Sequence, residues 1–281
     1  MCLSARWTLG FGRGDAETRR DSWRWLRWVQ MPTWNPQQYL KFAEERTRPC
    51  RDLAARIELP ERARIIDLGC GPGNSTEVLA ERWPEADLTG LDNSSDMIAK
   101  ATAAHPDWHW IAGGIAEWAA ADGEQYDLAF SNAALQWVPD HATVFPRLLS
   151  RATMVAVQVP GNWDGPAHQT MREVAKRYPL EGRVREWYTH DTTFYYDVMA
   201  PHARQLDIWA TEYIHILDGA EAVVEWYKGT GMRPFLEALE TDGERERFTA
   251  DYLEAIRGVY RPRADGKVLF PFRRLFLIAR R

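Results

Sequence analysis

The hydrophobic residues between Pro60 and Pro160 form short apolar runs that alternate with stretches of helical spacing. A short apolar run bounded by turn residues is typical of a strand that is buried on both faces of a parallel sheet. The runs predict strands at residues 64–68, 88–92, 108–112, 126–131 and 153–159, with helices at 74–83, 95–104 and 140–150. Because strand and helix alternate, we expect an α/β fold whose parallel sheet is covered by helices on both faces.

The segments on either side of this region have other patterns. Residues 39–56 have helical spacing that Pro49 interrupts, so we expect two short helices there. After Pro160 the spacing predicts helices at 169–178 and 220–228 and one or two more over 235–260, and we expect β-rich runs at 206–217 and 268–278 to extend the sheet. We therefore expect a single domain over residues 31–281, whose later connections form a helical cap.

The first thirty residues differ in composition from the rest. They contain six Arg and three acidic residues, and Arg alternates with Trp over residues 21–30. The terminal position and the Gly and Arg content predict a disordered extension over residues 1–30 that need not belong to the mature protein. A short basic amphipathic helix that lies on a membrane surface is the alternative.

The sharpest local feature is the sequence Asp67-Leu-Gly-Cys-Gly-Pro-Gly-Asn74, which follows a predicted strand and precedes a predicted helix. Glycines in this context let the backbone pass close to a ligand. The spacing of Gly69, Gly71 and Gly73 is not the G-x-G-x-x-G of dinucleotide enzymes. A carboxylate at Asp67 would repel a pyrophosphate and attract a cation, so a sulfonium cofactor with an amino-acid tail suits the loop better.

Further candidate residues end the next strands. Asp92 closes the second strand, where an acid can accept hydrogen bonds from both hydroxyls of a ribose. Ile115 follows the third strand, where a cofactor base can pack on it. Asn132 and Trp137 follow the fourth strand, at the carboxyl edge of the sheet, where open α/β sheets bind ligands. With their neighbours, the predicted cofactor-binding residues are Asp67, Gly69, Gly71, Gly73, Asp92, Asn93, Ile115, Ala116 and Asn132.

Composition and charge narrow the class of partner. Among 281 residues, 35 are Lys or Arg and 40 are Asp or Glu, and the net charge of −5 disfavours a nucleic-acid partner. The three cysteines, Cys2, Cys50 and Cys70, are widely spaced, which indicates a reducing cytoplasm and no metal site. No run approaches the ~18 apolar residues of a membrane span. We expect a cytoplasmic protein, most simply a monomer, that binds small molecules.

At these residues the chain resembles the class I S-adenosylmethionine-dependent methyltransferases, and more narrowly the trans-aconitate 2-methyltransferase family. The glycine loop and Asp92 carry the general resemblance, and the narrow one extends from Met31 to the C-terminus, including the cap. The segments that carry it are 34–49, 73–76, 132–141, Asn162-Trp163, Tyr195-Tyr-Asp197, 230–234 and 274–281. The resemblance implies a Rossmann-like sheet of seven strands with the last antiparallel, a cofactor-binding core over residues 61–160 and a substrate cap mainly over 161–265.

The resemblance also implies a reaction, which is methyl transfer from S-adenosylmethionine to a carboxylate of trans-aconitate to give a monomethyl ester. Such enzymes often place an Asp near the adenine amino group at the end of the third strand. This chain has Gly114 there, so we expect backbone groups near Ile115 and Ala116 to bind the adenine. A carboxylate is already ionised at neutral pH, because its reference pKa is about 4, and no general base is needed.

The acceptor is a tricarboxylate, and a planar guanidinium pairs with carboxylates through two hydrogen bonds. Of the 35 cationic residues 30 are Arg, and we expect Arg233 and Arg274 to bind the acceptor, with Arg46 and Arg48 as second choices. Tyr39, Tyr195 and Trp137 are the predicted neutral walls. His141 is predicted to start a helix, since the chemistry needs no base.

Three other functions remain open from the residues. Another small-molecule O-, N- or C-methyltransferase would keep the cofactor site but would need a base and a less cationic pocket. An NAD-dependent oxidoreductase is disfavoured by Asp67 and by the glycine spacing. A non-catalytic protein that only binds the cofactor would bind it without forming a methyl ester.

Overall fold

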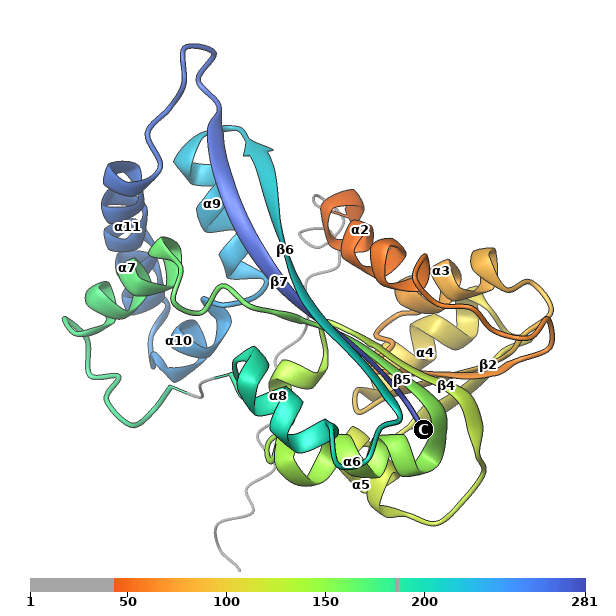
Figure 1. Ribbon diagram of the computed structural model, residues 1–281. Helices are drawn as coiled ribbons and strands as arrows, with labels where there is room; N and C mark the ends of the chain where they lie inside the picture. The colour runs from red at the N-terminus through yellow and green to blue at the C-terminus, as the bar shows by residue number, and fades with distance from the viewer. Residues whose placement is uncertain (1–42, 185–186) are drawn as a thin grey trace, which may run out of the picture. The chain divides into compact units, whose positions relative to one another are not determined.

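The computed structural model describes residues 43–184 and 187–281, and the predicted extension over residues 1–30 and Tyr39 lie outside this part (Figure 1). The described chain forms a seven-stranded sheet with the strand order β3-β2-β1-β4-β5-β7-β6. The predicted fold class is therefore confirmed, including the antiparallel last strand.

The parallel half of the sheet consists of the predicted strands. They are β1 (Arg64–Leu68), β2 (Asp87–Asp92), β3 (His109–Ala112), β4 (Tyr126–Asn132) and β5 (Ala152–Pro160). Ile66 of β1 pairs with Thr89 on one side and with Ala129 on the other. The carboxyl ends of β1, β2 and β4 consequently meet at one edge, which carries the glycine loop.

The last two strands match their predicted ranges to within two residues. β6 (Gln205–Leu217) pairs antiparallel with β7 (Val268–Arg280) along its whole length. β7 also pairs with β5, but only from Arg280 to Arg274, opposite Met154 to Pro160. The first residues of β7 and the last of β6 therefore continue beyond the carboxyl edge as a two-stranded ribbon (Figure 1).

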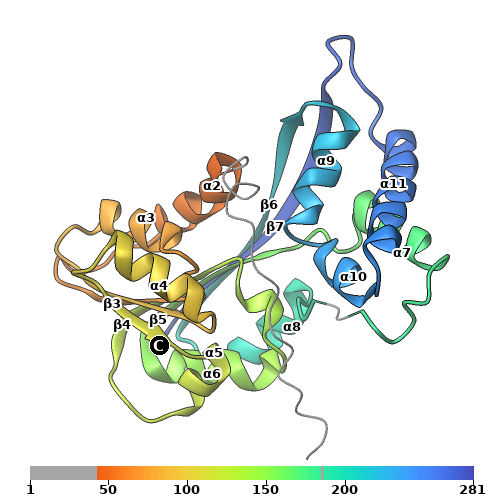
Figure 2. The same ribbon diagram turned by 180° about the vertical axis from the view of Figure 1, so that it is seen from behind.

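Helices cover both faces of the sheet because the strand residues alternate between two cores. One core joins residues such as Ile66 and Val155 to α5 (Ile115–Ala120), α6 (His141–Arg151) and α8 (Thr192–Met199). The other joins residues such as Ile65 and Phe276 to α2 (Ala43–Ala54) and α3 (Asn74–Arg82). A further helix, α4 (Ser95–Ala104), connects β2 to β3, and Figure 2 shows it beside α3.

One helix prediction is wrong. The structure has a single helix, α2, with Pro49 inside it, where the sequence predicts two short helices. Proline removes one helical hydrogen bond. Cys50 and Leu53, which follow it, are buried in the core beside α3, so packing holds the helix together across this position.

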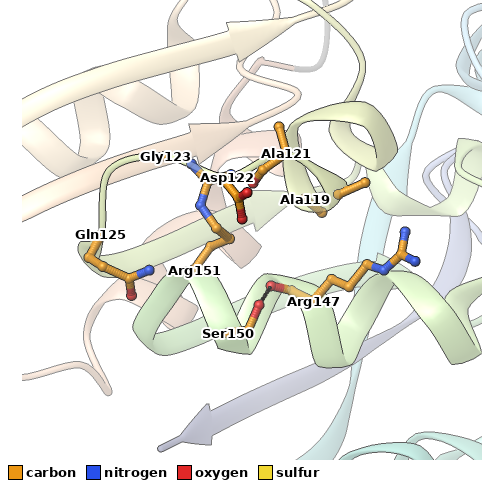
Figure 3. A pocket seen from close by; sticks show the side chains of 9 residues that line it. Ala119, Ala121, Asp122, Gly123, Gln125, Arg147, Ser150 and Arg151 are labelled. Carbon is orange, nitrogen blue, oxygen red and sulfur yellow. Dashed lines mark hydrogen bonds between the residues drawn. The ribbon is translucent and has the colours of Figure 1, made fainter.

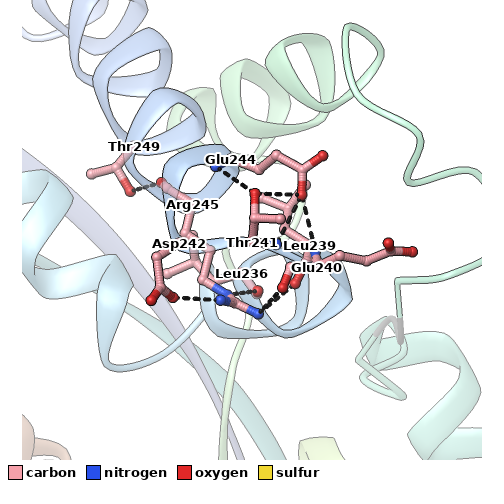
Figure 4. A network of polar contacts seen from close by, with 8 residues as sticks. All are labelled: Leu236, Leu239, Glu240, Thr241, Asp242, Glu244, Arg245 and Thr249. Atoms are coloured by element: carbon pink, nitrogen blue, oxygen red, sulfur yellow. Dashed lines mark hydrogen bonds and ion pairs between the residues drawn. The ribbon is translucent and has the colours of Figure 1, made fainter.

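The cap has a hydrophobic core of its own around the ribbon. α7 (Pro166–Ala175), α9 (Gly219–Lys228), α10 (Arg233–Ala238) and α11 (Asp242–Val259) surround residues such as Trp226, Tyr252 and Phe270. Figure 4 shows the corner between α10 and α11, where Thr241 and Glu244 form a capping box. Arg245 donates hydrogen bonds to the carbonyl groups of Leu236 and Leu239 there, so the corner is fixed by side chains.

Candidate functional site

The glycine loop has a backbone that only glycine adopts readily. Gly69, Gly71 and Gly73 have φ values of 77°, 57° and 104°, in the left-handed region. The N–H groups of Gly69 and Cys70 both donate to the carbonyl oxygen of Leu91, at 2.7 and 3.1 Å. A methyl group at Gly69 would lie closer than 3.0 Å to Cβ of Ala134, beyond the end of β4. The loop is thus held against β2 and β4 at the carboxyl edge.

Asp67, at the base of this loop, is fully buried, and only one of its two carboxylate oxygens is hydrogen-bonded within the described chain. Its Oδ2 accepts hydrogen bonds from the hydroxyls of Ser75 (2.6 Å) and Thr76 (2.7 Å) in α3. Its Oδ1 has no hydrogen-bond partner within the described chain. Burial raises the pKa of Asp67 to about 6, so the carboxylate is mainly ionised at neutral pH. An unpaired buried carboxylate oxygen fits a ligand that brings a cationic group.

Asp92 links the loop to the second strand. Its Oδ2 accepts from the Gly71 N–H and its Oδ1 from the Ser94 N–H, both at 2.9 Å. Burial also raises the pKa of Asp92. The predicted neighbour Asn93 is exposed just after β2. The structure thus brings two acids and three glycines together, which is the arrangement expected for a cofactor with a cationic tail and a ribose.

Glu117, in the helix α5 that follows β3, is a residue that the sequence analysis missed. Ile115 starts α5, is buried, and its Cδ1 would lie 3.6 Å from a methyl group on Gly69. The carboxylate of Glu117 folds back over Gly114 and takes the space that a side chain at that position would need. An acidic group is therefore present at this end of the strand, although residue 114 does not provide it. Binding of adenine by Ile115 and Ala116 stays a prediction.

Arg274 lies where β7 leaves the sheet, opposite Pro160 of β5. It is 5% exposed, and its guanidinium carbon lies 4.3 Å from the centre of the Phe272 ring. The guanidinium of Arg48, in α2, lies 5.1 Å from the centre of the nearby Tyr213 ring. Burial, together with the charges of Arg274 and Arg48, lowers the pKa of His215 to about 4. The two arginines therefore produce a positive field at one place on the sheet.

The other residues that are predicted to bind the acceptor substrate lie on different elements of the fold. Arg233 is the first residue of α10, and its Nε donates to Oε1 of Glu237 at 2.5 Å. Arg46 belongs to α2, but its side chain lies outside the described part. The hydroxyl of Tyr195 is buried, lies 2.9 Å from Nδ1 of His141 and accepts from the His190 N–H. As expected, His141 begins a helix, α6.

Trp137 belongs to an aromatic cluster that the sequence did not predict. It ends the short 3₁₀ helix η1 (Leu135–Trp137), and its ring lies edge-on to Trp187 at 5.8 Å. Trp187 also contacts Trp163 (5.5 Å) and His168 (4.9 Å). Burial lowers the pKa of His168 to about 3, so this side chain is neutral at physiological pH. Of the residues that surround Trp137 in this cluster, only Trp163 had a signal in the sequence, as part of the Asn162-Trp163 segment.

The structure also has a groove at the opposite edge of the sheet (Figure 3). It is lined by residues that precede β4 and β5, among them Gln125, Ser150 and Arg151. Arg151 donates to the carbonyl oxygens of Trp118 and Ala121, both at 2.6 Å, and these bonds fix the loop before β4. The groove therefore lies at the opposite edge of the sheet from the glycine loop. The hydrogen bonds of Arg151, which lines it, give this side chain a structural role.

The sheet order, the antiparallel β7 between β5 and β6, and the glycine loop with its two acids define a class I methyltransferase of the S-adenosylmethionine-dependent type. Solved structures share the fold. The YcgJ protein of Bacillus subtilis superimposes with a TM-score of 0.55 at 12% identity, over 83% of this chain and 98% of its own. Phosphoethanolamine N-methyltransferase 2 of Haemonchus contortus gives 0.52 at 14% identity, over 83% of this chain and 52% of its own.

Sequence comparison is more specific. The "Methyltransferase domain" family matches residues 65–153. A trans-aconitate 2-methyltransferase of Azoarcus sp. (strain BH72) is 48% identical over 89% of this chain and 99% of its own. Another, of Afipia carboxidovorans, is 47% identical over 89% of this chain and 100% of its own. The chain belongs to the trans-aconitate 2-methyltransferase family.

Proposed function

We propose that this protein transfers the methyl group of S-adenosylmethionine to a carboxylate of trans-aconitate and forms a monomethyl ester. The similarity that supports this function covers 89% of the chain, including the cap, and not only the cofactor-binding strands. The cap is the part expected to differ between methyltransferases with different acceptors. The cofactor supplies a methyl group that is activated by the sulfonium charge.

The residues around the glycine loop have separate roles toward the cofactor. We assign the cationic amino group of its methionine part to the unpaired Oδ1 of Asp67, because Oδ2 is already bound by Ser75 and Thr76. We assign the ribose hydroxyls to Asp92, and contact with the base to Ile115 and Ala116. Gly69, Gly71 and Gly73, with Asn93 and Asn132, shape the remaining contact surface.

On the acceptor side, the reaction needs orientation more than proton transfer. An ionised carboxylate is already a nucleophile, and holding it in line with the methyl group removes much of the barrier of a two-substrate reaction. We assign Arg274 and Arg233 to the carboxylates that do not react, and Trp137 to a neutral wall. Tyr195, whose hydroxyl is bonded within the fold, acts by positioning His141 beside η1.

The setting of the reaction is also part of the proposal. Cys50 and Cys70 are free and buried, which suits a reducing cytoplasm. No helix of the described residues is long and apolar enough to cross a membrane. We propose a monomer with a cofactor-binding core over residues 61–160 and a substrate cap over 161–265.

The decisive experiment is mass spectrometry of the products after incubation with methyl-labelled S-adenosylmethionine and trans-aconitate. A labelled monomethyl ester is expected with trans-aconitate, and little product with neutral acids, amines or phenols. Cofactor turnover with an amine or a phenol instead would indicate another small-molecule methyltransferase. Binding of S-adenosylhomocysteine without any ester would indicate a non-catalytic binding protein, and tight NADH binding in its place would favour an oxidoreductase.

A further inference from the structure

Four polar side chains cross the sheet in a row on the face that α2 and α3 cover. They are Asp67 on β1, Asn132 on β4, Gln158 on β5 and Arg274 on β7. Gln158 is in register with Asn132, whereas Asp67 and Arg274 are each offset by two residues from their neighbour in this staggered row. Their strand neighbours Ile65, Phe130, Ala156 and Phe276 belong to the core on that face, and alternation places residues two positions further on the same side. The row lies at the carboxyl edge, where these strands end or leave the sheet.

Gln158 is the member of this row that the sequence analysis did not single out. Its side chain is 0% exposed, and neither Nε2 nor Oε1 has a hydrogen-bond partner within the described chain. Its backbone carbonyl oxygen accepts from the Ala133 N–H at 2.9 Å. Leaving buried amide groups unpaired is destabilising, so the free protein keeps Gln158 at the expense of stability.

The neighbours of Gln158 indicate what it binds. The cofactor loop is bonded to Leu91 and Asp92 of β2, on one side of β1. Gln158 lies on the other side of β1, two strands away, between β4 and the strand that carries Arg274. A neutral amide on the strand next to a buried guanidinium, and offset from it by two residues, provides additional N–H donors without additional charge, which suits a carboxylate.

We infer that Gln158 is a binding residue for the acceptor, and that its Nε2 donates a hydrogen bond to an acceptor carboxylate beside Arg274. The inference rests on the proposed function for the identity of the acceptor. It makes Gln158 a determinant of specificity, because an acceptor without a carboxylate at this position leaves the amide unpaired.

The test uses opposite effects on stability and on acceptor binding. Gln158→Met replaces the amide by an apolar group of similar length, and we expect its thermal unfolding midpoint to rise by about 2 °C or more. We also expect KM for trans-aconitate to rise about tenfold to a hundredfold, with the Kd of S-adenosylhomocysteine unchanged. Gln158→Glu should weaken acceptor binding further, because it adds a negative charge.

The matched control for stability is Gln136→Met. Gln136 is also a buried glutamine near this edge, and its Oε1 likewise has no partner among the described residues, but its Nε2 donates to the Ala133 carbonyl oxygen at 2.7 Å. This variant should therefore lose stability where Gln158→Met gains it. If Gln158→Met gains stability and loses acceptor binding, the inference is supported. Replacing a glutamine with a purely structural role would not raise stability while weakening acceptor binding.

Two results would overturn the assignment of Gln158. One is an unchanged KM in Gln158→Met, and the other is a weakened affinity for S-adenosylhomocysteine, which would place the amide in the cofactor site. Failure of the proposed function has a different signature. If the wild-type protein forms no ester from trans-aconitate, thermal stabilisation of its S-adenosylhomocysteine complex by citrate or cis-aconitate, absent in Gln158→Met, would still support carboxylate binding by Gln158.

Discussion

Replacing Gly69 by alanine tests how the glycine loop is built. The new methyl group would be placed on a residue with φ of 77° and closer than 3.0 Å to Cβ of Ala134. The left-handed conformation costs a residue with a side chain about 1–2 kcal/mol. Forcing one methyl group into packed surroundings costs about 1–3 kcal/mol more. We expect Gly69→Ala to lower the free energy of unfolding by about 2–5 kcal/mol in total.

Gly71→Ala separates the two contributions. Gly71 has φ of 57°, and no heavy atom of the described chain would lie within 4 Å of its added methyl group. It should therefore lose only the conformational part, about 1–2 kcal/mol. The double variant Gly69→Ala with Ala134→Gly removes the overlapping atom, so it should recover most of the steric part relative to Gly69→Ala alone.

The assays are urea unfolding of each variant and calorimetric titration with S-adenosylhomocysteine. Relief of the overlap requires the loop or the end of β4 to move, so Gly69→Ala should also bind the ligand more weakly than Gly71→Ala. If the two single variants unfold at the same urea concentration, or if Ala134→Gly restores nothing, the contact between the loop and β4 does not control this site.

Three further predictions concern individual side chains. Arg233→Ala should raise KM for trans-aconitate about tenfold and leave S-adenosylhomocysteine affinity unchanged; unchanged turnover of trans-aconitate would exclude Arg233 as an anion-binding residue. S-adenosylhomocysteine affinity should fall as the pH drops through about 6, where Asp67 is protonated, while Asp67→Asn should bind weakly with a flatter pH dependence. Folding raises the pKa of Asp67, so ionisation of this carboxyl group should lower the free energy of unfolding of the ligand-free protein as the pH rises from about 4 to 6. Tyr195→Phe should destabilise by about 1–2 kcal/mol in urea unfolding, because it leaves Nδ1 of His141 unpaired, and a large rise in KM without this loss would argue for direct contact with the acceptor.

The parallel half of the sheet is predictable from the sequence because its information is local. Each of these strands is a short apolar run between turn residues, and the glycine loop follows the first of them directly. Asp67 and Asp92 are likewise found by their place at strand ends. For these residues, a position in the chain is enough to predict a position at the carboxyl edge.

The remaining parts depend on contacts between distant segments. Pro49 predicts a helix break, but packing of α2 against the sheet overrides that local preference. The cluster of Trp137, Trp163 and Trp187 joins residues from three connections, and no periodicity reveals such a meeting. Gln158 looks like any polar residue within a strand until the register places it beside Asn132. What identifies it is the absence of a partner among the described residues, which only a three-dimensional structure shows.

Under the proposed assignment, the position of Arg274 explains how an acidic chain, with a net charge of −5, binds an acceptor of high negative charge. Two residues on one side of it along β7, Phe276 is buried in the sheet core, and two residues on the other side, Phe272 is buried in the cap core. A guanidinium fixed between two packed cores loses little conformational freedom when it binds a carboxylate, in contrast to one on an exposed loop. The same strand spans both cores, so the distance from the cofactor-binding sheet to this charge is set by the fold. Selection among acceptors would then fall to groups around Arg274 that can tell one carboxylate arrangement from another. Gln158, on the adjacent strand and two residues from the register position opposite Arg274, is one of these groups.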